Sequence, residues 1–326
     1  MTDSLDSQLE KYLSDAYSIE KQALVQMKMA PGIAGDARLA KLFEDHCRET
    51  EGHERLIGAR LEARGGSPSK VKNAVMEAGG VGFALFAKAQ PDTPGKLVAH
   101  AHSYEALEEA SYDLLALVAE QAGDQETVEV AQRIRDEEIA MKQRLAGVFD
   151  VAAHASLREV EPDDLDEQLI KYLADAHALE QQAIELLERG QTIAGDSALA
   201  SLFEEHLAET RGHAERVEAL IVQKGGRTSS VKDAALRLGA LNWGGFFAAH
   251  PDTPGKLAAF AYAFENLEIA GYGLLRCVAA HAGDGHAVLL AEQILAEERA
   301  AAEKIQAEFG HALSSTLVEQ GIAPQA

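Results

Sequence analysis

The chain repeats itself once, and this repeat limits the folds that it can adopt. Adding 160 to a residue number aligns the two halves without a gap, so that the Lys-Tyr-Leu of residues 11–13 recurs at 171–173. A period of this length is the size of a domain, whereas solenoid repeats run to about 20–50 residues. The sequence therefore predicts a duplicated domain, with a first copy over residues 1–150, a linker over 151–164 and a second copy over 165–326.

Composition and charge argue against several classes of partner. With 47% hydrophobic residues among 326, each copy can bury a core of its own. The formal net charge of −23 argues against nucleic acid, because contact with a phosphate backbone needs clustered lysines and arginines. No run of about 18 apolar residues is present to span a bilayer, and the polar, acidic N-terminal residues lack the pattern of a secretory signal. We therefore expect a cytoplasmic protein that binds neither a membrane nor nucleic acid.

Helix start and stop signals divide each copy into four long segments. In the first copy these run from about Leu5 to Met29, ending before Pro31, and then over residues 36–65, 92–123 and 124–150. The first and last connections are short, which makes antiparallel neighbours, while the middle connection holds about 27 residues, enough for a crossover with extra short helices. This connectivity is that of a ferritin-like bundle with one crossover. We predict an all-α fold of two tandem ferritin-like four-helix bundles.

Each segment carries an apolar stripe of residues three and four positions apart, and polar side chains interrupt every stripe near its midpoint. Carboxylates lie at this level on all four segments, and the second segment adds two histidines. In the first copy the candidate metal ligands are Glu20, His46, Glu49, His53, Glu105, Glu108 and Glu138. Their equivalents in the second copy are Glu180, His206, Glu209, His213, Glu265, Glu268 and Glu298.

Five carboxylates at one level of a core need neutralisation. Two like charges about 4 Å apart repel by roughly 4 kcal/mol at an effective dielectric constant of 20, and no lysine or arginine lies in the middle of any stripe. Shared protons or metal ions can neutralise them. A single buried polar residue is more often a register device, but a whole cluster that recurs in the second copy favours metal. Mixed carboxylate and imidazole ligands suit Fe, Mn or Zn, and we expect two ions per bundle, with iron preferred.

Two further expectations concern individual residues. Glu49 and Glu209 each follow one histidine and precede another, on what we expect to be the innermost line of the helix, so that each would bridge two ions. Tyr104 and Tyr112 lie beside the third stripe; such aromatics more often pack than act as redox relays.

Taken together, these motifs resemble a known family. The His-x-x-Glu-Thr of residues 46–50, with Ala-Tyr-x-x-Glu at 16–20, Glu-x-x-Glu-x-x-x-Tyr at 105–112 and Asp-Glu-Glu at 136–138, is similar to the YciF-type ferritin-like stress proteins. The resemblance implies a bundle of the rubrerythrin and ferritin kind, a di-metal centre and a link to bacterial stress responses. By this match the ligands would be Glu20, His46, Glu49, Glu105, Glu108 and Glu138. The chain departs from that family in being a fused pair.

The sequence leaves two functions of different classes open. The preferred one is a di-iron or di-manganese protein, such as a ferroxidase or a peroxide-reducing oxidoreductase, that oxidises metal or consumes oxygen or peroxide under stress. An electron donor would be external, since no Cys-x-x-Cys pair is present. The alternative is a non-catalytic stress protein with a structural metal or an interaction role. We also expect the apolar crossover segments 81–87 and 241–247 to pack between the bundles, making an intramolecular pseudo-dimer.

Overall fold

The structure is a computed structural model that describes residues 4–67, 92–194, 197–228 and 253–322. Over these residues the chain is helical and contains no β-strand, which confirms the predicted all-α class. It divides into two compact units, Met1–Arg158 with Gly321–Ala326 and Glu159–Gln320, called here the first and second units. None of the described helices combines the length and the apolarity needed to cross a membrane.

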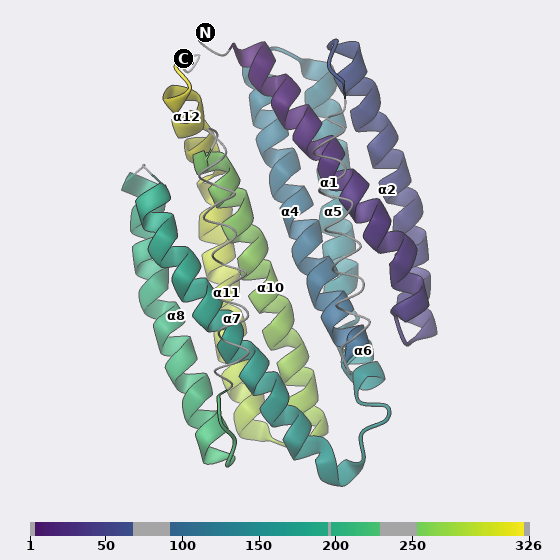
Figure 1. Ribbon diagram of the computed structural model, residues 1–326, viewed down its shortest axis with the longest axis vertical. Helices are drawn as coiled ribbons and strands as arrows, with labels where there is room; N and C mark the ends of the chain where they lie inside the picture. Colours follow the sequence, from purple (N-terminus) through teal and green to yellow (C-terminus); the bar gives the residue numbers. More distant parts are fainter. Residues whose placement is uncertain (1–3, 68–91, 195–196, 229–252, 323–326) are drawn as a thin grey trace. The chain divides into compact units, whose positions relative to one another are not determined.

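Four long helices make up most of the described part of the first unit (Figure 1). They are α1 (Leu5–Ile33), α2 (Ala37–Ala63), α4 (Thr93–Gln121) and α5 (Gln125–Ala146), followed by the short α6 (Phe149–Ser156). Helix α1 packs on α2 and α4, and α4 packs on α5 and α6, whereas α2 and α5 touch at only a few positions. The four long helices therefore surround one interior, which is least tightly closed between α2 and α5.

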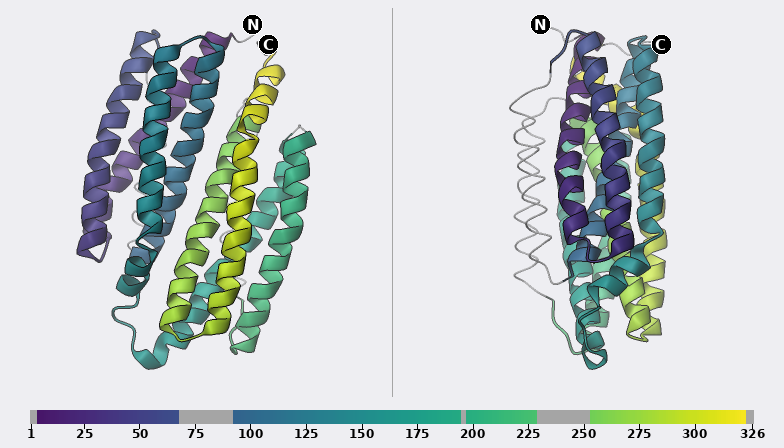
Figure 2. Two further views of the ribbon diagram at one scale, coloured as in Figure 1. Left: turned by 180° about the vertical axis from the view of Figure 1, so that it is seen from behind. Right: turned by 90° about the vertical axis from the view of Figure 1, so that its right-hand side faces the viewer.

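The second unit repeats this arrangement of helices (Figure 2). Its elements are the one-turn helix η1 (Pro162–Asp164), α7 (Leu165–Ile193), α8 (Ser197–Gln223), α10 (Thr253–His281), α11 (Gly285–Ala307) and α12 (Phe309–Glu319). Each long helix begins 160 residues after its counterpart in the first unit. Helix α7 packs on α8 and α10, and α10 on α11, while α8 and α11 touch at few positions. The repeat in the sequence is thus a repeat of structure.

Local capping explains where several helices begin. The Asp36 carboxylate accepts hydrogen bonds from the backbone N–H groups of Arg38, at 2.8 Å, and Leu39, at 3.3 Å. Asp124 accepts one from the N–H of Thr127, at 3.1 Å. These bonds satisfy donors that the first turn of a helix leaves without partners. The predicted starts of the second and fourth long helices are confirmed.

The predicted ends of the first and fourth long helices are wrong. Helix α1 continues through Pro31 to Ile33, and α7 ends at the equivalent Ile193 although it has no proline there. A proline in the last turn removes one donor and so affects few hydrogen bonds. The chain turns instead at Gly35, which has a φ of +68° and lies where a Cβ would come within 2.8 Å of Pro94. Glycine tolerates both conditions.

At the other end of the first unit, α5 ends at Ala146 and not near Asp150. The chain then forms α6, which packs on α4, so residues 151–156 of the expected linker are helical. The crossovers expected between the second and third long helices, including segments 81–87 and 241–247, lie outside the described residues.

Asp124 also ties two helix ends together, which leads to a test of stability. Its carboxylate accepts hydrogen bonds from the buried Arg60, at 2.9 and 3.0 Å, and from Arg64, at 2.9 Å. In the second unit Asp284 keeps the cap and pairs with Lys224, but Leu220 replaces Arg60.

We expect Asp124→Ala to lower the free energy of unfolding of its unit by about 3 kcal/mol. The lost cap is worth about 1 kcal/mol, and a buried guanidinium deprived of its carboxylate adds about 1–3 kcal/mol. Asp284→Ala is the matched control and should lower it by about 1 kcal/mol, because no buried arginine depends on it. Calorimetric melts of the two variants check this; equal losses would contradict it.

Candidate metal centre

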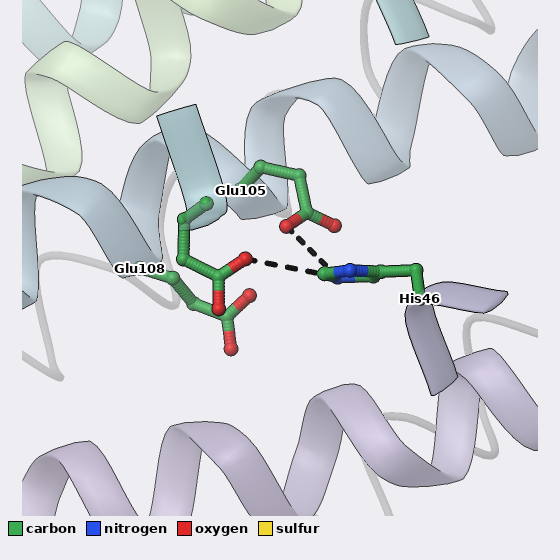
Figure 3. A group of neighbouring side chains, drawn as sticks. His46, Glu105 and Glu108 are labelled. Carbon is green, nitrogen blue, oxygen red and sulfur yellow. Dashed lines mark ion pairs between the residues drawn. The ribbon is translucent and has the colours of Figure 1, made fainter. Parts of the chain in front are cut away.

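Midway along the first unit, all four long helices turn polar side chains into the interior. Four carboxylates and two imidazoles meet there, each at most 1% exposed: Glu20 from α1, His46 and His53 from α2, Glu105 and Glu108 from α4, and Glu138 from α5. Figure 3 shows the carboxylates of Glu105 and Glu108 directed toward the ring of His46. One of the ion pairs marked there joins His46 Nε2 to Glu105 Oε2 at 3.1 Å.

The six side chains form two overlapping groups, in each of which the candidate ligand atoms lie within 4.8 Å of one another. One group holds His46, Glu105, Glu108 and Glu138, and the other holds Glu20, His53 and Glu138. Glu138 belongs to both. Its Oε1 lies 2.7 Å from His53 Nδ1, and its Oε2 lies 3.7 Å from His46 Nε2. One carboxylate therefore presents an oxygen to each group.

The second unit has two corresponding groups, and Glu298 is shared between them. They hold His206 with Glu265, and His213 with Glu180. Glu298 Oε1 lies 2.6 Å from His213 Nδ1, and its Oε2 lies 3.4 Å from His206 Nε2. Glu268 is also fully buried but belongs to neither group.

Each histidine directs its other ring nitrogen to a carboxylate outside the cluster. In the first unit His46 Nδ1 lies 3.1 Å from Glu49 Oε2, and His53 Nε2 lies 2.8 Å from Glu137 Oε2. The equivalent distances in the second unit are 3.2 Å, to Glu209, and 2.7 Å, to Glu297. Metal-binding histidines commonly make such a second contact, which fixes the tautomer and the orientation of the ring.

The structure corrects the position expected for Glu49 and Glu209. The Glu49 side chain is 36% exposed and accepts hydrogen bonds from both terminal nitrogens of Arg144, at 3.3 and 2.7 Å. The next residue, Thr50, lies on the buried line instead, as does Thr210 in the second unit. The expectation that these glutamates lie innermost is wrong, and the residue with an oxygen toward both groups is Glu138.

Most inward-facing atoms of the cluster lack a hydrogen bond of good geometry. In the first unit these include both carboxylate oxygens of Glu105, Glu108 and Glu138, together with His46 Nε2 and His53 Nδ1. In the second unit both oxygens of Glu268 and Glu298 are in the same condition. A buried polar atom left unpaired costs about 1–3 kcal/mol, and more if it is charged. Carboxylate oxygens and imidazole nitrogens that converge on one space in this way fit a cation held among them.

Without a cation, the cluster holds protons that exposed side chains would have released. Burial, with repulsion from Glu138, raises the pKa of Glu20 to about 8, and burial with repulsion from Glu105 raises that of Glu138 to about 7. Burial alone would lower the pKa of His53, but Glu138 and Glu20 raise it to about 9. In the second unit, neighbouring carboxylates overcome the effect of burial and raise the pKa values of His206 and His213 to about 10. Metal binding at neutral pH would therefore release protons.

A tyrosine contacts the cluster in both units. The hydroxyl of Tyr112 donates to Glu20 Oε1, and that of Tyr272 donates to Glu180 Oε1. Both rings are 1% exposed. Tyr104 instead donates to the backbone oxygen of Ile19, and phenylalanine replaces it in the second unit. The contact that recurs therefore fixes the carboxylate of α1 or α7 in place.

One protein family matches the chain twice. The model of a family described as a domain of unknown function (DUF892) matches residues 4–157 and again residues 164–316. Each match spans one copy of the repeat, as expected of a tandem duplication. No solved structure matches the chain.

Proposed function

Since the chain belongs to the DUF892 family and carries two tandem copies of that domain of unknown function, we propose its activity from the chemistry of its two clusters. The proposal is a ferritin-like protein of the YciF type in which each unit holds two transition-metal ions, with iron preferred. Its activity would be the oxidation of metal, or the consumption of oxygen or peroxide under stress, with an external electron donor.

The observation that carries the proposal is a cluster of four glutamates and two histidines in the first unit, in which one of the glutamates, Glu138, belongs to both groups. Di-iron carboxylate bundles take one Glu from each of two helices and a Glu-x-x-His pair from each of the other two, which also gives four glutamates and two histidines. Here α2 supplies both histidines and α4 supplies two glutamates, so the same set is distributed differently. Four carboxylates also balance the charge of two divalent cations.

We assign a role to each side chain. In the first unit His46, Glu105 and Glu108 would hold one ion, Glu20 and His53 the other, and Glu138 both. In the second unit His206 and Glu265 would hold one ion, with Glu268 nearby, Glu180 and His213 the other, and Glu298 both. Glu49, Glu137 and their equivalents would orient the histidine rings, and Tyr112 and Tyr272 the carboxylates to which they donate.

The two proposed ions would supply redox chemistry on oxygen or peroxide, which is what a pair of iron ions offers. The protein contributes a buried site: the six cluster side chains of the first unit are at most 1% exposed, which excludes bulk water. Protons held on Glu20 and the histidines would leave as the ions bind, since their pKa values are raised.

The same burial favours a second candidate, a structural metal in a non-catalytic stress protein. Structural sites are closed by their protein ligands, whereas catalytic sites keep a position open to substrate. In that case the chain would bind its ions and leave oxygen and peroxide unchanged.

Metal content and oxidation kinetics test the proposal together. We expect protein reconstituted with Fe(II), Mn(II) or Zn(II) to retain four ions per chain by elemental analysis, two for each unit. We also expect aerobic oxidation of Fe(II), followed by ultraviolet absorbance, to be faster than with a chain whose Glu138 and Glu298 are alanine. Four bound ions with oxidation no faster than in that variant would favour the structural metal. No metal above background would contradict both candidates.

A further inference from the structure

A groove on the surface of the first unit leads to its cluster. It has a volume of about 620 Å³ and lies between α2 and α5, the neighbouring helices that touch at the fewest positions. Its lining includes Asp45, Glu49 and His53 from α2, and Arg133, Glu137 and Arg144 from α5. Because His53 both lines the groove and belongs to the cluster, the groove adjoins the cluster.

Two carboxylates stand between the groove and the cluster. Glu49 and Glu137 are both about one-third exposed, and each also contacts the outer ring nitrogen of a cluster histidine. The second unit has a groove of about 410 Å³ at the corresponding seam, lined by Glu209, Glu297 and Lys304 among others but by no histidine of its cluster. Both units therefore have a groove lined by the carboxylates that contact the cluster histidines.

We propose that these grooves are the ports through which divalent cations reach the clusters. The first groups that an incoming ion meets would be the outer carboxylates, which are Glu49 and Glu137 in the first unit and Glu209 and Glu297 in the second. This inference rests on the proposed metal centre. Among the described seams between the long helices of each unit that pack on one another, this one has the fewest contacts, and in the first unit its groove reaches a cluster histidine. Carboxylate oxygens that line it attract a cation, and in each unit they contact the outer ring nitrogens of the cluster histidines.

Arginines hold the outer carboxylates of the first unit. Arg144 binds Glu49 with two hydrogen bonds, and Arg133 Nε lies 3.1 Å from Glu137 Oε1. An incoming ion has to displace a guanidinium from each carboxylate before it can bind there. A two-bond guanidinium contact is harder to displace than a lysine, which offers a single point charge.

The second unit holds only one of its outer carboxylates in this way. Arg216, from α8, pairs with Glu297 at 2.5 Å. Lys304 and Gln293 replace Arg144 and Arg133, and in the described part of the chain Glu209 makes no ion pair with lysine or arginine. An ion therefore meets one outer carboxylate without a lysine or arginine partner in the second groove and none in the first. The second cluster is expected to fill faster.

Rates of cobalt binding test the port. Glu298→Ala leaves a chain with only the first cluster intact, and Glu138→Ala leaves one with only the second. Metal-free protein is mixed with Co(II) in a stopped-flow instrument, and the visible absorption of bound cobalt is followed. The chain with only the second cluster should fill up to about fivefold faster, the scale of one partly exposed ion pair.

Reciprocal substitutions then exchange the groups at one position. Arg144→Lys should speed the filling of the first cluster, and Lys304→Arg should slow that of the second, with the cobalt bound at saturation unchanged in both. Arg48→Lys is the matched control: Arg48 also lines the first groove but pairs with Asp45 and with neither outer carboxylate, so the rate should not change.

Equal filling rates, unaffected by both exchanges, would overturn the port while leaving the metal centre intact. Failure of either cluster to bind cobalt at equilibrium would instead overturn the metal centre, and the port with it. If a single-cluster chain does not fold, the intact chain gives the same information as two kinetic phases, of which Arg144→Lys should speed the slower one.

Discussion

Replacing Glu138 and Glu298 together with alanine is expected to abolish paired metal binding, so that the chain retains none of its four ions under conditions that saturate the wild type. Each of these glutamates presents one oxygen to each group in its unit, so one substitution removes a ligand from two ions. Loss of an outer partner alone commonly weakens metal affinity by about 10–100-fold. Loss of a shared ligand should exceed the upper figure. Isothermal titration with Zn(II) and elemental analysis measure the loss.

The matched control is Glu109→Ala. Glu109 is a buried glutamate on the same helix as Glu105, but it pairs with Lys142, outside the cluster. The second unit has Ile269 and Ala302 at these two positions. The control should therefore retain all four ions. A double variant at Glu138 and Glu298 that still held four ions would contradict the assignment of the shared ligand.

The stability of the same double variant without metal separates a metal centre from a structural polar network. Removing one crowded carboxylate relieves repulsion that only a cation or protons would offset, so the metal-free variant should melt no lower than metal-free wild type. A structural network predicts a loss, because its buried partners would each be left unpaired at about 1–3 kcal/mol.

The metal-free protein is expected to lose stability steadily between pH 6 and pH 9. Glu20 has a pKa of about 8 in the folded state against an ordinary 4.5, so between these values the folded chain holds a proton that the unfolded chain has released. Stability therefore falls as pH rises and the folded group releases that proton. His53 has a pKa of about 9 in the folded state against an ordinary 6.5. Between these pH values the folded chain again holds more protons than the unfolded chain, so this histidine also lowers stability as pH rises.

Both units contribute in this direction, since Glu180, at about 7, and His206 and His213, at about 10, are raised as well. A pKa displaced by one unit corresponds to about 1.4 kcal/mol, so the total loss should be on the order of several kcal/mol. Urea unfolding in the presence of a chelator, at pH 6, 7, 8 and 9, measures it.

Saturating Zn(II) should remove most of this dependence and raise the melting temperature at pH 8, because the ions replace the protons and bind only the folded state. A metal-free protein that became more stable toward pH 9 would show that the cluster is not protonated as its pKa values require.

Much of the fold could be predicted because its signals are local. A carboxylate such as Asp36 or Asp124 caps a helix through contacts within three residues, which the sequence displays directly. The end of α1 could not be read in the same way. Pro31 is the stronger local signal, yet the chain turns at Gly35, where Pro94 from a distant helix requires the absence of a side chain.

The candidate site shows the same division between local and distant information. His46 and His53 lie two turns apart and share a face whichever neighbours are buried. Glu49 and Thr50 flank that face on opposite sides, about 60° and 40° from His46 at 3.6 residues per turn, and a single helix cannot choose between them. The choice depends on how the helix packs against its neighbours: Arg144, 95 residues away, binds Glu49 at the surface of the first unit. In the second unit Thr210 is buried and Glu209 is exposed without an arginine partner among the described residues.

The position of Glu137 beside the apolar stripe of its helix does not identify it as a partner of His53. The sequence does carry one signal: the second copy keeps a glutamate, Glu297, at the same place, and the structure shows it in contact with the equivalent histidine. Even the arginine that pairs with this glutamate is supplied from α5 in one unit and from α8 in the other.

The sparse packing between α2 and α5 has a consequence for motion. In a four-helix unit, the pair with the fewest contacts is where transient separation requires the least free energy, and backbone amides there should exchange with solvent through partial opening. The proposed ions would join His46 and His53 on α2 to Glu138 on α5, across this same seam. Metal would thus act as a reversible cross-link where packing is weakest, and amide exchange in α2 and α5 of a loaded unit would slow to the rate at which the ions dissociate.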